Sequence, residues 1–116
     1  MKPLKETSLR LVWSIFLILS NLQGFAATVE DLRKKAEAGD AKAQIELGML
    51  YLDGKGVRKD AVEGVKWLRK AADQGDARGQ VELGLAYATG TGVSKDVEKA
   101  FDLYRKSAEQ GYAKHK

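Results

Sequence analysis

The most constraining feature of this sequence is a repeat of 36 residues, marked by Gly39, Gly75 and Gly111. When residues 39–74 are aligned with residues 75–110 without a gap, 17 of the 36 positions are identical. A period of this length is typical of a solenoid, in which each unit buries its apolar face against the next unit. The repeat therefore predicts stacked helices, an architecture whose usual role is to bind other molecules.

The first 26 residues differ in character from the repeats. A basic stretch precedes an apolar run over residues 11–19, and Gly24 and Ala26 follow at the spacing of a cleavage site. The run is too short for a membrane-spanning helix, which needs about 20 apolar residues. We therefore predict a signal peptide over residues 1–26 that is cleaved after Ala26, with an uncleaved membrane anchor as the alternative. The predicted location is the periplasm of a Gram-negative bacterium, or the medium.

Charge and cysteine content exclude several kinds of function. Removal of residues 1–26 leaves 17 lysines and arginines against 15 aspartates and glutamates, a net charge of +2. The basic residues alternate with acidic ones along the expected helices, which favours a solvated face over a nucleic-acid site. The chain has no cysteine, which excludes disulfides, thiolate nucleophiles and thiolate metal ligands.

Each unit is expected to contain two helices joined by a glycine-rich loop. The first helices should run from about Ala41 to Leu52 and from Ala77 to Ala88. Aspartates precede all four helices, as N-caps do: Asp40, Asp60, Asp76 and Asp96. Glu63 could complete a capping box with Asp60. The second helices should end at Gly75 and Gly111, each a candidate left-handed residue after the helix.

The apolar residues of the second helices predict how the units stack. Four of them share one face in the first unit, and four share it in the second: Ala61, Val65, Leu68 and Ala72, matched by Val97, Phe101, Tyr104 and Ala108. Trp67 and its counterpart Leu103 lie beside this face and are expected to close the seam between units. Gly48 and Gly84 recur inside the first helices, where glycine is unfavourable, which indicates close approach of a partner helix.

The domain organisation follows from the phase of the repeat. After residues 1–26, the prediction is a half-repeat helix over residues 28–38, full repeats over 39–74 and 75–110, and a tail over 111–116. The fold class is thus an all-α, right-handed solenoid of helix-turn-helix repeats. Two repeats are fewer than the three or so that a solenoid usually needs, so partner binding or self-association should stabilise the chain.

The pattern A-x-x-G-D-A-x-x-Q-x-x-L-G-x-x-Y, G-x-G-V-x-K-D and W-x-R-K-A-A-x-Q-G resembles the Sel-one-like repeat, a branch of the tetratricopeptide superfamily. It covers Ala36–Gln74 and Ala72–Gly111. The sequence departs from the pattern at Gly64, Gly79 and Leu103, which should cost stability. The resemblance implies an adaptor or scaffold that binds proteins.

The resemblance also implies a concave groove lined by the first helices. Its contact positions are Lys42, Ile45, Met49, Leu52 and Asp53, followed by Arg78, Val81, Leu85, Ala88 and Thr89. Helical spacing independently places residues 42, 45, 49 and 52 on one face. One interpretation is an apolar groove with a basic lip, suited to a peptide or helix that carries an acidic group. The alternative is that Ile45 and Met49 simply pack on a neighbouring helix.

The sequence offers no catalytic or metal-binding pattern. His115 is next to the last residue, and Ser94 and Ser107 have no evident base. Glu46 and Glu82 occupy equivalent repeat positions, which favours a structural or solvated role over a catalytic pair. We therefore expect no metal, no cofactor and no enzymatic activity. Cysteine-rich members of the resembled family are associated with β-lactam binding, but this chain lacks their cysteines.

The predicted function is an exported, non-catalytic protein-interaction module that acts as an adaptor or regulator. An alternative is a periplasmic immunity protein that neutralises a secreted toxin. A third and less favoured alternative for the function is a hydrolase of the cysteine-rich type. The predicted partner is a protein, with no nucleic acid and no membrane insertion once the signal is removed.

Overall fold

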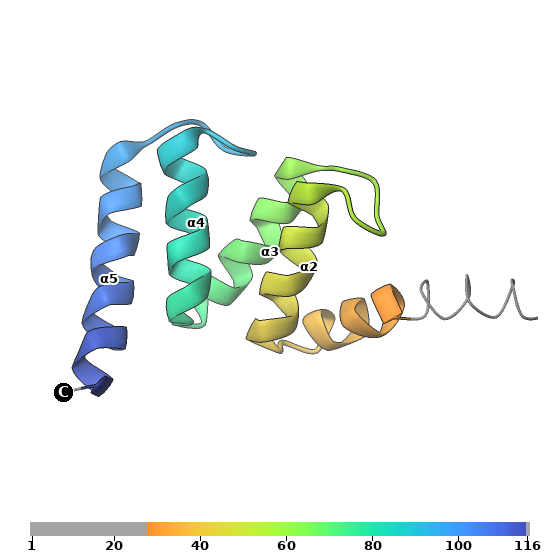
Figure 1. Cartoon of the computed structure of the whole chain (residues 1–116), viewed down its shortest axis with the longest axis horizontal. Coiled ribbons are helices and arrows are strands. Elements are labelled where there is room, and N and C mark those ends of the chain that lie inside the picture. Colours follow the sequence, from red (N-terminus) through yellow and green to blue (C-terminus); the bar gives the residue numbers. More distant parts are fainter. Residues whose placement is uncertain (1–27, 116) are drawn as a thin grey trace, which may run out of the picture.

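The computed structural model describes residues 28–115 of the chain, and the predicted signal peptide lies outside them. The first helix includes residues 28–37 and is called helix 28–37 below. Four helices follow it, and no strand occurs within the described range: α2 (Ala41–Asp53), α3 (Ala61–Asp73), α4 (Ala77–Thr89) and α5 (Val97–His115). Figure 1 shows them in chain order from orange to blue. The predicted all-α repeat fold of five helices is confirmed.

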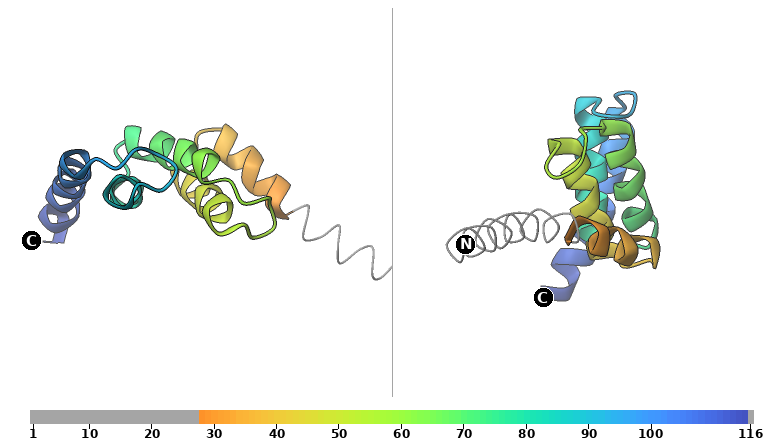
Figure 2. Two further views of the ribbon diagram at one scale, coloured as in Figure 1. Left: turned by 90° about the horizontal axis from the view of Figure 1, so that it is seen from above. Right: turned by 90° about the vertical axis from the view of Figure 1, so that its right-hand side faces the viewer.

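The helices form two layers that follow the repeat. α2 packs against α3, α3 against α4, and α4 against α5. Seen from above in Figure 2, α2 and α4 lie on the inner side of a shallow arc, with helix 28–37 and α3 on its outer side. The first helices of the two units therefore share one face of the molecule, as the solenoid reading predicts.

Aspartate side chains start the helices as predicted. Asp40, Asp60, Asp76 and Asp96 each accept a hydrogen bond from the backbone N–H three residues later, at 2.9–3.3 Å. This satisfies one of the N–H groups that the first helical turn leaves without a partner. The predicted capping box at Glu63 is wrong, because the Asp60 N–H already donates to the Tyr51 carbonyl oxygen at 2.9 Å.

The close approach predicted for Gly48 is present between α2 and α3. A Cβ atom added at Gly48 would lie 2.8 Å from the Gly64 carbonyl oxygen, and one added at Gly64 would lie 2.7 Å from the Gly48 carbonyl oxygen. The two helices thus cross with glycine against glycine. Gly64, which the family pattern marks as a departure, belongs to this contact, so a larger residue there would push the helices apart.

A recurring arginine–tyrosine contact holds neighbouring units together. Arg33 donates a hydrogen bond to the Tyr51 hydroxyl at 2.8 Å, and 36 residues later Arg69 donates to the Tyr87 hydroxyl at 2.7 Å. The bond to Tyr51 raises the pKa of Arg33 above its ordinary value. Arginine stays protonated at physiological pH in any case, so this seam does not depend on pH there.

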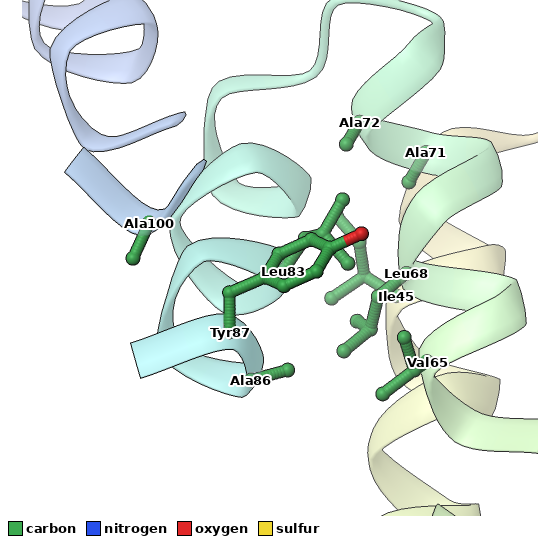
Figure 3. Close-up of a cluster of buried hydrophobic side chains, with 9 residues drawn as sticks. All are labelled: Ile45, Val65, Leu68, Ala71, Ala72, Leu83, Ala86, Tyr87 and Ala100. Atoms are coloured by element: carbon green, nitrogen blue, oxygen red, sulfur yellow. The ribbon is translucent and has the colours of Figure 1, made fainter. Parts of the chain in front are cut away.

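Two hydrophobic clusters form the core. The larger lies between α2, α3 and α4, and Figure 3 shows Leu68 and Val65 of α3 facing Leu83 and Tyr87 of α4. The smaller surrounds Trp67, which packs with Ala36, Ala43 and Leu47. Trp67 thus joins helix 28–37 to the first repeat, as the seam prediction requires.

The predicted packing face of the last helix differs from the structure. Val97 is 58% exposed and Phe101 is 72% exposed, whereas their counterparts on α3 are half-buried Ala61 and buried Val65. The reason is geometric: the α3 face is covered by α4, and within the described residues no helix follows α5.

α5 also continues through Gly111, where the sequence predicted a helix end. Gly111 is not among the described glycines with positive φ, whereas Gly39 and Gly75 have φ of 100° and 88°. Those two are followed by the capping residues Asp40 and Asp76, but Gly111 is followed by Tyr112. Tyrosine offers no carboxylate to begin a new helix, and the existing helix extends instead.

Candidate functional site

An open apolar depression lies between the C-terminal halves of α2 and α4, with a volume of about 270 Å³. We call it the α2/α4 hollow. Its lining residues come from both helices and from the loop after α4: Met49, Leu52, Glu82, Leu85, Ala86, Thr89 and Thr91. Both helices lie on the inner side of the arc in Figure 2.

The local structure fixes the shape of the hollow. Met49 and Leu52 are half-buried and pack on the larger core cluster, which holds the α2 wall in place. Leu85, on the α4 wall, is 50% exposed. The Thr89 hydroxyl lies 2.9 Å from the Leu85 carbonyl oxygen and 2.8 Å from the Thr91 hydroxyl. These bonds tie the loop to the end of α4 and form a polar rim.

The structure brings only part of the predicted groove together. Met49, Leu52, Leu85 and Thr89 line the hollow. Ile45 is 2% exposed and belongs to the core, so the alternative reading, packing on a neighbouring helix, describes it better. The remaining apolar positions are Val81, which is 40% exposed on α4, and Ala88, which is half-buried against the larger cluster. Asp53 is exposed at the end of α2.

The basic residues of the predicted lip do not line the hollow. Lys42 and Arg78 are exposed in the first turns of α2 and α4, and Arg78 borders a separate recess beside Gln110. From Arg78 to Leu85 the helix rises about 10 Å, at roughly 1.5 Å per residue. The charged side chain at the hollow itself is Glu82, which is half-buried. The charged residue at the edge of the hollow is thus acidic, whereas the sequence predicted basic residues there.

Sequence reasoning missed three lining residues: Glu82, Ala86 and Thr91. Glu82 and Ala86 lie on the same helical face as the predicted Leu85 and Thr89, so a wider face would have included them. Thr91 had no comparable signal. Its place depends on how the Thr89–Lys95 loop folds back, which helical spacing does not describe.

The described residues offer little for chemistry. Among residues 28–115, no group of three histidine, cysteine or acidic side chains is arranged to hold a metal ion. The Ser107 hydroxyl is buried and donates to the Ala77 carbonyl oxygen at 2.8 Å, a contact between α5 and α4. Glu46 is exposed while Glu82 is half-buried, and the side chain of His115 lies outside the described atoms.

Within residues 28–115, no helix has both the length and the apolar character needed to cross a membrane. Stacked helix pairs with a shared inner face and an apolar hollow define the chain as a helical-repeat protein of the solenoid class.

The chain belongs to the Sel1 repeat family, whose sequence profile matches residues 41–76 and 77–112. This confirms the resemblance derived from the repeat pattern. Proteins of this family are typically protein-interaction modules. The secretory immunoglobulin A-binding protein EsiB of Escherichia coli is 46% identical over 39 residues, which are 34% of this chain and 8% of EsiB.

Solved structures share the fold. The protective antigen c5321 of uropathogenic Escherichia coli superposes with a TM-score of 0.72 at 45% identity, over 74% of this chain and 18% of that one. A Sel1 repeat protein from Oxalobacter formigenes gives 0.69 at 32% identity, over 75% of this chain and 35% of that one. Helicobacter pylori cysteine-rich protein B gives 0.69 at 29% identity, over 72% and 62%. The chain thus spans less than two thirds of the length of each relative.

Proposed function

We propose that the protein is an exported, non-catalytic interaction module that binds a peptide or helix of a partner protein along the face shared by α2 and α4. The observation that carries the proposal is the α2/α4 hollow, with Leu85 half exposed beside Met49 and Leu52. An apolar recess of this kind offers a place for an apolar side chain of a partner. The family's role in protein interaction supports the same reading.

The charges of this face indicate which partner segment would fit. An apolar side chain would enter the hollow, and a basic or N–H-rich group beside it would meet Glu82. About 10 Å away, Lys42 and Arg78 stand in the first turns of α2 and α4, where the helix dipoles also favour negative charge. The preferred segment therefore carries an apolar anchor and an acidic residue roughly three extended residues apart.

The compartment in this proposal is the periplasm or the cell exterior. Its support is the sequence of residues 1–26, with its basic start, short apolar run and small residues at the expected cleavage site. EsiB is a binding protein for secretory immunoglobulin A, which is an extracellular protein, and this is compatible with the proposed compartment. The proposed role is that of an adaptor or regulator of an envelope protein.

Substitution of Leu85 by aspartate is expected to abolish partner recovery from an envelope extract of the producing bacterium. Immobilised wild-type protein should recover one partner in stoichiometric amount. In the variant, a charge placed in the hollow opposes entry of an apolar side chain and stands beside Glu82. Quantitative mass spectrometry of the eluates measures the recovery, which should fall at least tenfold.

Val62→Asp provides the matched control, because Val62 is 55% exposed on α3 and lies outside the hollow. Both variants should keep the far-ultraviolet circular dichroism of the wild type. The α2/α4 assignment fails if Leu85→Asp recovers as much partner as Val62→Asp does.

A further inference from the structure

A second recess lies between α3, α4 and α5, away from the α2/α4 hollow, and has a volume of about 240 Å³. Leu83, Tyr87 and Leu103 form its apolar part. Its remaining lining residues are charged: Arg69, Asp73, Lys99, Asp102 and Lys106. We call it the Leu103 recess.

The equivalent place in the first repeat is filled by a tryptophan. Trp67 is 6% exposed there and packs with Leu47 and Tyr51. The Lys70 Nζ atom stands 4.5 Å from the centre of its ring, a cation–π contact. One repeat later, 36 residues along the chain, the corresponding residues are Leu83, Tyr87, Leu103 and Lys106. All four line the Leu103 recess.

The recess thus marks the place where the second unit lacks an indole ring. Gly79 stands at the repeat position equivalent to Ala43, and it partly offsets the missing ring volume by letting α4 approach α3. A Cβ atom added at Gly79 would lie 2.9 Å from the Ala71 Cβ atom. The rest of the lost volume stays open beside Leu103, which is only half-buried. Lys106 has no ring beneath it, and among the described contacts it has no hydrogen-bond or ion-pair partner.

The charges around the recess are mainly positive. Lys99 Nζ lies 5.4 Å from the centre of the Tyr87 ring, and Arg69 donates to the hydroxyl of the same residue. Asp102 is paired with Arg105 at 2.7 Å. Of the two carboxylates that line the recess, only Asp73 is without an ion pair among the described contacts. The recess also has three cationic side chains: Arg69, Lys99 and Lys106. A ligand that brings negative charge is favoured.

We propose that the Leu103 recess binds a tryptophan side chain of a partner protein, next to an acidic residue of that partner. The incoming indole would take the place that Trp67 occupies in the first repeat, between Leu103 and Tyr87 and under Lys106. The adjacent carboxylate would pair with Lys99 or Lys106. This site is separate from the α2/α4 hollow and does not depend on it.

The test uses the purified protein and three capped dipeptides as probes, with binding followed by amide chemical shifts. Acetyl-Trp-Glu-amide should shift the signals of residues on α4 and α5 around the recess, with a dissociation constant of roughly 1 mM. Acetyl-Trp-Lys-amide should bind several-fold more weakly, and acetyl-Ala-Glu-amide should not saturate. Equal binding of the alanine probe would overturn the proposal, because charge alone would then explain it.

Two variants test the location. Leu103→Trp should fill the recess from within and weaken acetyl-Trp-Glu-amide at least tenfold, while Val62→Trp, at an exposed position outside both the recess and the hollow, should leave its binding unchanged. Lys106→Glu, an exposed position that should not disturb folding, should weaken it about tenfold. The proposed site would be refuted if Lys106→Glu and Leu103→Trp, as separate variants, both bound acetyl-Trp-Glu-amide as tightly as the wild type does. Because Leu85→Asp tests the other hollow, the two proposals can fail independently.

Discussion

Replacement of Trp67 by alanine is expected to lower the free energy of unfolding by about 3–5 kcal/mol, the usual cost of deleting a buried tryptophan. Trp67 is 6% exposed and is the largest side chain that joins helix 28–37 to the first repeat. The total free energy of unfolding of a native protein is only about 5–15 kcal/mol, so the variant should be close to unfolding. Urea titration followed by circular dichroism measures the loss.

Two further variants make this prediction specific. Leu103→Ala, at the equivalent but half-exposed position, should cost only about 1 kcal/mol. Trp67→Phe should also cost less than Trp67→Ala, because a ring remains and the buried Nε1–H, which has no hydrogen-bond partner among the described atoms, is removed. Equal losses for Trp67→Ala and Leu103→Ala would show that Trp67 does not hold the seam.

Gly48→Ala is expected to destabilise the protein by about 1–3 kcal/mol, although alanine is normally the better helix former. The added methyl group would lie 2.8 Å from the Gly64 carbonyl oxygen and 3.1 Å from Leu68 Cγ, so α2 and α3 would have to separate. Thermal unfolding of the variant measures this cost.

Gly111→Ala serves as the matched control because it should have the opposite effect. Gly111 lies inside α5, and a Cβ atom there would meet nothing within 4 Å. Only the helix propensity then changes, which should stabilise the protein by up to about 1 kcal/mol. A stabilising Gly48→Ala would contradict the close crossing of α2 and α3.

The fold was largely predictable because its signals are local and repeated. Asp40 and Asp76 stand before apolar-periodic segments, and the loop glycines Gly54 and Gly90 adopt φ of 70° and 71°. Both signals depend on a residue and its immediate neighbours, so the sequence reveals them directly. The capping box at Glu63 was predicted wrongly, because its formation depends on whether the backbone N–H of Asp60 is free, and the carbonyl group of Tyr51 in the preceding helix takes it.

The candidate site was less predictable, because it depends on contacts between helices. Helical spacing places Ile45 and Met49 on one face, but only the packing of α2 against its neighbours decides that Ile45 is buried while Met49 lines the hollow. The same holds for Phe101, whose apolar character predicted packing although the structure leaves it exposed. The sequence showed that Leu103 replaces a tryptophan but could not show that a recess remains.

We propose that the protein works by binding a partner through the face shared by α2 and α4. Hydrogen–deuterium exchange of the protein with and without its isolated partner tests it most directly. We predict that the partner slows exchange in the C-terminal halves of α2 and α4 and in the loop around Thr91, the segments that form the hollow. Protection confined to α3 and α5, with α2 and α4 unchanged, would contradict the claim.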